Sequence, residues 1–131
     1  MIGSRREARE TALGLLYEAD LRGESLSETL GRQVVPPVEY AGVLVAGVAA
    51  HRDEIDGLLR TAAHDWSLER MAVLDRAVLR LATYELAHCP DVPTGAVVDE
   101  AVELAKQYST DESGRFVNGI LGTLARQLRP D

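Results

Sequence analysis

Helical spacing of the apolar residues is the feature that most limits what this chain can fold into. Every long segment repeats its apolar residues three or four positions apart, and none alternates convincingly at every second position. Such spacing is typical of amphipathic helices. The apolar share is 46% and only 5% of residues are aromatic, a mixture that favours packed helices over a β-sandwich. We therefore expect residues 1–131 to form one all-α domain of six or seven helices.

Capping signals and prolines divide this pattern into helices. The pairs Ser4–Glu7 and Ser25–Glu28 have the spacing of capping boxes, which predicts helix starts near residues 4 and 25. The pair Pro36–Pro37 breaks the chain and can lie in the first turn of a third helix, which we expect to run unbroken to about Ala63. The later helices are expected after Ser67 as far as Pro90, from about Thr94 to Tyr108, and from about Asp111 to Leu128.

The formal net charge of −7 restricts how the chain could bind nucleic acid. Long-range attraction over the whole surface is excluded, so binding would need a local basic patch or a basic partner. No apolar run is long enough to span a membrane, and the N-terminus lacks the apolar core of a signal peptide. The single cysteine, Cys89, cannot form an internal disulfide. A cytoplasmic protein is the expectation.

Catalytic and metal-binding patterns are absent from the sequence. The three histidines (His51, His64 and His88) are far apart in the chain, and none has the spacing of metal ligands. His51 falls on an apolar stripe, where a core or edge histidine is expected, and Cys89 is interpreted as a buried hydrophobe near a helix end. The carboxylates within Asp99–Glu103 are expected to be solvated. We predict no enzyme activity, no cofactor and no bound metal.

The first helix carries one of two candidate binding surfaces. Arg5 and Arg9 lie four positions apart on one expected face, and Arg6 is adjacent. An external anion would relieve their repulsion, and the helix dipole favours anions at this end, so the cluster could bind RNA phosphates. Alternatively, Arg6 pairs with Glu10.

Arg115 and Phe116 form the second candidate surface, at the start of the last helix. An arginine plane and an aromatic ring are what unpaired RNA bases stack on. Phe116 lies about 100° from the apolar stripe of its helix. The alternative is that Phe116 half-buries against a neighbouring helix. Asp111 and Glu112 would repel phosphate here, so contact with bases is favoured.

Four segments, taken together and in order, resemble the transcription antitermination factor NusB family over essentially the whole chain. They are "RREARETALGLLYEADL", "LDRAVLRLATYEL", "DVPTGAVVDEAVELAKQYSTDES" and "FVNGILG". The resemblance implies about seven helices in two packed three-helix subdomains, the first three helices against the rest. It also implies binding of boxA RNA from ribosomal RNA leader transcripts together with the ribosomal protein NusE, within an RNA polymerase complex that reads through terminators.

The resemblance also implies site residues. The implied RNA contacts are Arg5, Arg6, Arg9, Glu112, Arg115 and Phe116. The implied contacts with NusE are Tyr17, Leu21, Arg80 and Glu85. A basic partner would suit the acidic balance of this chain, and RNA binding by the chain alone should be weak and strongly dependent on salt.

One departure from the family pattern keeps other interpretations open. The arginine-rich start is reduced, because Glu7 interrupts it and almost nothing basic precedes Ser4. A helical interaction module without RNA binding is therefore the second hypothesis. The third is the RNA-binding domain of a ribosomal RNA methyltransferase, although no α/β methyltransferase pattern follows by Asp131. The sequence also leaves open whether the free protein is a monomer or a homodimer.

Overall fold

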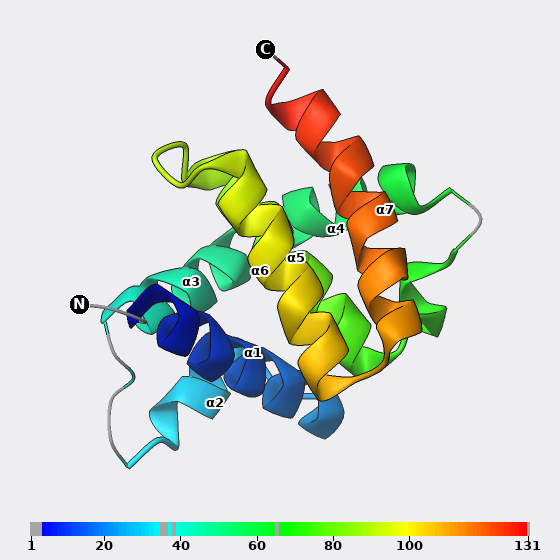
Figure 1. The fold of residues 1–131 in the computed structure, drawn as a ribbon. Coiled ribbons are helices and arrows are strands. Elements are labelled where there is room, and N and C mark those ends of the chain that lie inside the picture. Colours follow the sequence, from blue (N-terminus) through cyan, green and yellow to red (C-terminus); the bar gives the residue numbers. More distant parts are fainter. Residues whose placement is uncertain (1–3, 35–36, 38, 65, 131) are drawn as a thin grey trace.

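The computed structural model describes residues 4–34, 37, 39–64 and 66–130. Those residues form seven α-helices and one short 3₁₀ helix, η1, with no strand among them (Figure 1). The elements are α1 (Ser4–Arg22), α2 (Leu26–Gly31), α3 (Glu39–Ala50), α4 (Arg52–Ala63), η1 (Leu68–Arg70), α5 (Val73–His88), α6 (Thr94–Tyr108) and α7 (Asp111–Leu128). The expected all-α fold is confirmed. No helix within the described ranges is both long and apolar enough to cross a membrane.

Helix α5 lies at the centre of the arrangement. It contacts α1, α3, α4, α6 and α7. Helices α6 and α7 run antiparallel beside each other, whereas α1, α2 and α3 form a second group (Figure 1). Most residues of α5 are buried, and the buried apolar side chains of both groups join in one continuous cluster. The two surfaces of interest are therefore carried by helices anchored on α5.

The third expected helix is in fact two helices. The chain changes direction at His51, whose φ of −114° and ψ of 22° are not helical, so the expectation of an unbroken helix to Ala63 is wrong. The bend allows α3 to contact α1 while α4 contacts α7, and both also contact α5. Neither proline nor glycine stands at His51, so tertiary packing rather than local propensity determines this break.

The expected helix starts agree with the structure where it describes them. In the second capping box the Glu28 backbone N–H donates to Ser25 Oγ at 3.1 Å, and the Ser25 N–H donates to Glu28 Oε1 at 3.0 Å. Helix α1 begins at Ser4 as expected, but the capping side chain of that residue lies outside the described set. Of the two prolines before α3, Pro37 is described and precedes the helix, whereas Pro36 falls outside.

Candidate nucleic-acid interface

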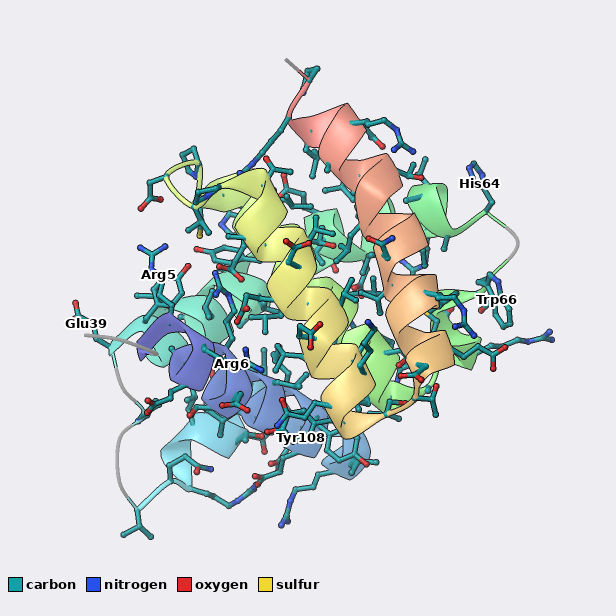
Figure 2. All side chains as sticks on the ribbon, viewed as in Figure 1. Arg5, Arg6, Glu39, His64, Trp66 and Tyr108 are labelled. Carbon is teal, nitrogen blue, oxygen red and sulfur yellow. The ribbon has the colours of Figure 1, made fainter. Side chains whose placement is uncertain are left out.

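Arg5 and Arg6 are exposed at the start of α1 (Figure 2). The Arg5 guanidinium lies 3.7 Å from the Asp91 carboxylate and 4.8 Å from the centre of the Tyr40 ring. The Arg6 guanidinium lies 3.8 Å from Glu100. Exposed ion pairs at such distances contribute little to stability. Both guanidinium groups can therefore exchange these carboxylates for a phosphate at small cost.

Arg9 does not share this exposed face. Its side chain is buried, and its guanidinium donates two hydrogen bonds of 2.8 Å to the Glu85 carboxylate on α5. Burial would lower the pKa of Arg9, but the hydrogen bonds and charge of Glu85 outweigh it and raise the pKa overall. The expectation that Arg5 and Arg9 lie together at the surface is wrong, because this part of α1 packs on α5. No comparison tests the predicted role of Arg9 in RNA binding.

Glu85, an expected partner contact, is equally inaccessible. It is 1% exposed and accepts a further hydrogen bond of 2.9 Å from the Tyr40 hydroxyl on α3. Burial first, and the Glu85 charge second, raise the pKa of Tyr40, so the phenol stays protonated and continues to donate. Glu85 thus joins α1, α3 and α5 from inside the protein.

Arg80, the other charged partner residue, is also turned inward. Its guanidinium donates to both oxygens of Asp56 on α4, at 2.9 and 3.1 Å, and lies 3.4 Å from Asp20 on α1. Arg76 pairs with the same Asp20 at 2.8 Å. With 8% exposure, Arg80 holds three helices together and presents no charge to an external partner in this structure. Its expected surface position is therefore wrong, like that of Glu85.

Tyr17 and Leu21 form an exposed apolar stripe on α1. They lie four positions apart, so they share one face of the helix, and they are 38% and 59% exposed. Tyr17 borders a cleft of about 600 Å³ between α1, the start of α5 and the end of α6. At its edge the Tyr108 hydroxyl donates to Glu10 at 2.7 Å, so Glu10 is bound there rather than to Arg6 as the alternative had it.

Phe116 and Trp66 contact each other at the border of a second cleft. Their ring centres are 5.4 Å apart and the planes meet at 75°, an edge-to-face arrangement. Phe116 is half-buried against the core, as the alternative interpretation had it, but its ring also borders the cleft of about 550 Å³. Trp66 is 56% exposed. Its only sequence signal was a polar neighbourhood, "HDWS".

The remaining lining of this cleft is strongly polar. Arg70 and Arg115 contribute exposed guanidinium groups, and Glu112 contributes an exposed carboxylate. Asp75 lies deeper, 8% exposed, where its Oδ2 accepts from the Ser113 hydroxyl at 3.2 Å. Its Oδ1 has no hydrogen-bond partner among the described atoms. An aromatic pair beside cations and an unused acceptor suits a flat group that carries N–H donors.

Comparison with known proteins identifies the family to which this chain belongs. The model of the NusB family matches residues 6–126. The chain belongs to the NusB family. The Transcription antitermination protein NusB of Saccharopolyspora erythraea is 53% identical over 130 residues, which cover 95% of this chain and 88% of that protein. The corresponding protein of Symbiobacterium thermophilum is 44% identical over 96% of this chain and 92% of its own length.

Solved NusB structures have the same fold. T. maritima NusB superposes with a TM-score of 0.86 at 37% identity and covers 97% of this chain and 94% of its own. A structure of antitermination factors NusB and NusE in complex with dsRNA matches with a TM-score of 0.82 at 32% identity, over 97% of this chain and 99% of that chain. The family assignment suggested by the sequence segments is therefore confirmed. The individual site residues of this NusB-family chain remain predictions.

Proposed function

We propose that this chain is a transcription antitermination factor that binds boxA-type RNA of ribosomal RNA leader transcripts together with NusE and supports read-through by RNA polymerase. Family membership supports the proposal, as does the similar structure that holds NusB, NusE and RNA. The observation that carries it is the polar cleft bordered by the Trp66–Phe116 aromatic pair. A cytoplasmic location follows from the proposal, because bacterial transcripts are made there.

The RNA is bound in two places that contribute different chemistry. Bases stack at the Trp66–Phe116 cleft, where Glu112 disfavours phosphate. Phosphates pair with Arg5 and Arg6 at the start of α1. Trp66 and the two arginines lie on opposite sides of the molecule in Figure 2. One RNA strand that uses both places therefore has to be extended over the face between them.

NusE binds at Tyr17 and Leu21 in this proposal. Tyr17 of this exposed apolar stripe borders the 600 Å³ cleft, which could accept an apolar side chain of the partner. The net charge of −7 complements a basic ribosomal protein. Arg80 and Glu85 act from within, as positioning residues that hold α1 in place on α5 and α4.

Fluorescence anisotropy of a labelled boxA-type RNA tests the RNA contact. Binding should be tight only when NusE is present with the chain. Phe116→Leu keeps apolar volume but removes the stacking surface, and stacking of one base is worth about 1–3 kcal/mol. The affinity of the mixture should therefore fall roughly 5- to 150-fold. Val43→Ala, at an exposed apolar position on α3, is the control and should leave it unchanged.

Calorimetric titration with NusE alone tests the partner contact. Tyr17→Ala and Leu21→Ser should each weaken the complex roughly tenfold or more if these residues are anchors, because truncation of a buried anchor costs about 2 kcal/mol. The Val43→Ala control should bind normally. Unchanged NusE affinity in both variants would remove this stripe from the proposed interface.

A protein-interaction module that does not bind RNA is the second candidate. It is favoured by the burial of Arg9, which leaves Arg5 and Arg6 as the exposed arginines of the α1 start. If the mixture fails to bind RNA while the chain and NusE still associate, this second candidate is correct and Phe116 has only a packing role.

A further inference from the structure

Two histidines that are far apart in the sequence lie together in the fold with a glutamate. His51 stands at the bend between α3 and α4, Glu54 lies in the first turn of α4, and His88 is the last residue of α5. His88 Nε2 is 2.6 Å from Glu54 Oε1, and His51 Nδ1 is 3.4 Å from the same oxygen. The histidines are far apart in the sequence, and the packing of α3 and α4 against α5 brings them together.

Packing determines the positions of the two imidazole rings. The rings are stacked with centres 3.9 Å apart, and the Tyr84 ring lies next to both, at 5.4 Å from His88 and 6.0 Å from His51. Tyr84 in turn lies directly against Gly47 of α3, where an added Cβ would overlap its ring. Gly47 and Tyr84 therefore support the histidines from α3 and α5, beneath the first-turn glutamate of α4.

The distances from Glu54 to the two histidine nitrogens are near the spacing that a metal ion requires. One ligand atom from each of the three side chains lies within 4.8 Å of the other two. Tetrahedral zinc with bonds of about 2.1 Å separates its ligand atoms by roughly 3.4 Å. The 3.4 Å between His51 and Glu54 already matches, and the 2.6 Å between His88 and Glu54 must lengthen by less than about 1 Å. The stacked rings must also rotate so that both lone pairs point at the ion.

The cluster is accessible and has the charge that a cation requires. The side chains of His51, Glu54 and His88 are 41%, 50% and 29% exposed, so an ion can reach them and the rings have room to rotate. The Glu54 carboxylate supplies a negative charge beside the two imidazole nitrogens. Two imidazoles and one carboxylate form a donor set that zinc prefers, with water completing the coordination.

We propose that His51, Glu54 and His88 form a binding site for a divalent transition-metal ion of the zinc class. The bound ion joins the start of α4 to the end of α5. Because it binds the folded chain and not the unfolded one, it raises thermal stability. The site is separate from the residues assigned to RNA and NusE, so it holds or fails independently of the proposed function.

Calorimetric titration of Zn²⁺ into untagged, chelator-treated full-length protein tests the site. One ion should bind per chain, and the melting temperature should rise with it. His51→Ala and His88→Ala should each weaken Zn²⁺ binding at least tenfold, the scale on which metal sites respond to a lost interaction. His64→Asn is the matched control, because this third histidine lies apart from the cluster and asparagine tolerates its positive φ of 48°. The control should bind Zn²⁺ as the wild type does.

Absorption spectra with Co²⁺ separate this site from its neighbour Cys89. Imidazole and carboxylate ligands should give visible bands without a thiolate charge-transfer band. Absence of saturable 1:1 binding would overturn the proposal, and so would equal binding by both histidine variants. A thiolate band that is lost in Cys89→Ala would also overturn it, because the ion would then be held by the cysteine. Circular dichroism should show that at least one of the two histidine variants is folded.

Discussion

At the scale of single residues, burial distinguishes arginines that their sequence spacing places in one cluster. The sequence predicts that Arg5, Arg6 and Arg9 form one basic cluster. In the structure Arg9 points into the interior and forms an ion pair with Glu85. The helical period placed Arg5 and Arg9 on one face, and it contained no information on where α5 would cover that face. Residue type and spacing could therefore predict a cluster here, while tertiary contacts determined which arginines are exposed.

The buried pair is expected to be structural. Removing one partner of a buried ion pair leaves an uncompensated charge and typically costs about 3–5 kcal/mol. Glu85→Ala and Arg9→Ala should each lower the free energy of unfolding by about that amount, and the double variant should cost less than the sum. Urea denaturation monitored by circular dichroism measures all three. A loss below about 1 kcal/mol for Arg9→Ala would show that Arg9 is not committed to Glu85.

Substitution of Glu7, at the exposed start of α1, tests whether RNA binding can be strengthened. Glu7 is exposed beside Arg5 and Arg6, so its charge opposes phosphate binding. Glu7→Arg should tighten binding of boxA-type RNA to the mixture with NusE several-fold at low salt. Glu7→Gln should give a smaller gain, since it removes a charge without adding one. No change in either variant, measured by anisotropy, would argue that the start of α1 is not an RNA contact.

At the scale of helices, the sequence predicted most of the boundaries correctly. Capping signals and prolines lie where helices start and end, so local chemistry was sufficient for α2, α6 and α7. The bend at His51 carries no such signal, and it was missed for that reason. The proximity of His51 and His88 was missed because it depends on the packing of α3 and α4 against α5. Of the second cleft, the sequence predicted Phe116 but not Trp66. The two residues come from separate elements, and their contact depends on packing.

Arg129, which follows α7, binds the C-terminal end of α5. Its guanidinium donates to the carbonyls of Glu85, Leu86, Cys89 and Val92 and to Thr94 Oγ1, at distances of 2.6–3.2 Å. Arg129 therefore adds charged donors at the C-terminal end of α5, where the carbonyls of Glu85 and Cys89 also accept backbone N–H groups. Arg129→Ala should reduce the free energy of unfolding by about 2 kcal/mol or more. Arg129→Lys should retain only part of the stability that Arg129→Ala loses, because an ammonium cannot reproduce the planar set of guanidinium donors. Equal stability of all three proteins in urea would contradict this role.

The connection between α1 and α2 should respond to acid. Hydrogen bonds from Arg32 and Thr29 lower the pKa of Glu24 to about 2, below its ordinary value of 4.5. Since the folded-state pKa is depressed, this contribution to stability is present above about pH 4.5 and is lost as the pH falls towards 2. Glu24→Gln should therefore lose less stability than wild type over that window. Thermal melts at several pH values measure this, and identical pH profiles would contradict it.

At the scale of the whole molecule, an acidic chain has to bind an acidic polymer. The net charge of −7 predicts that the chain depends on few phosphate contacts, on base stacking and on a basic partner. This dependence on stacking and on a basic partner could be predicted from composition alone. Only the fold shows where the candidate groups lie, with Arg5 at the start of α1, the Trp66–Phe116 pair at the second cleft and an apolar stripe on α1.

The salt dependence of RNA affinity tests this division most directly. The affinity of the mixture with NusE for boxA-type RNA would be measured against salt for wild type, Arg5→Ala/Arg6→Ala and Phe116→Leu. Each phosphate contact to single-stranded RNA contributes about 0.7 to the slope of log affinity against log salt. The double arginine variant should flatten the slope by about 1.4, whereas Phe116→Leu should lower the affinity without changing the slope. An unchanged slope in the arginine variant, with unchanged affinity in Phe116→Leu, would contradict the account.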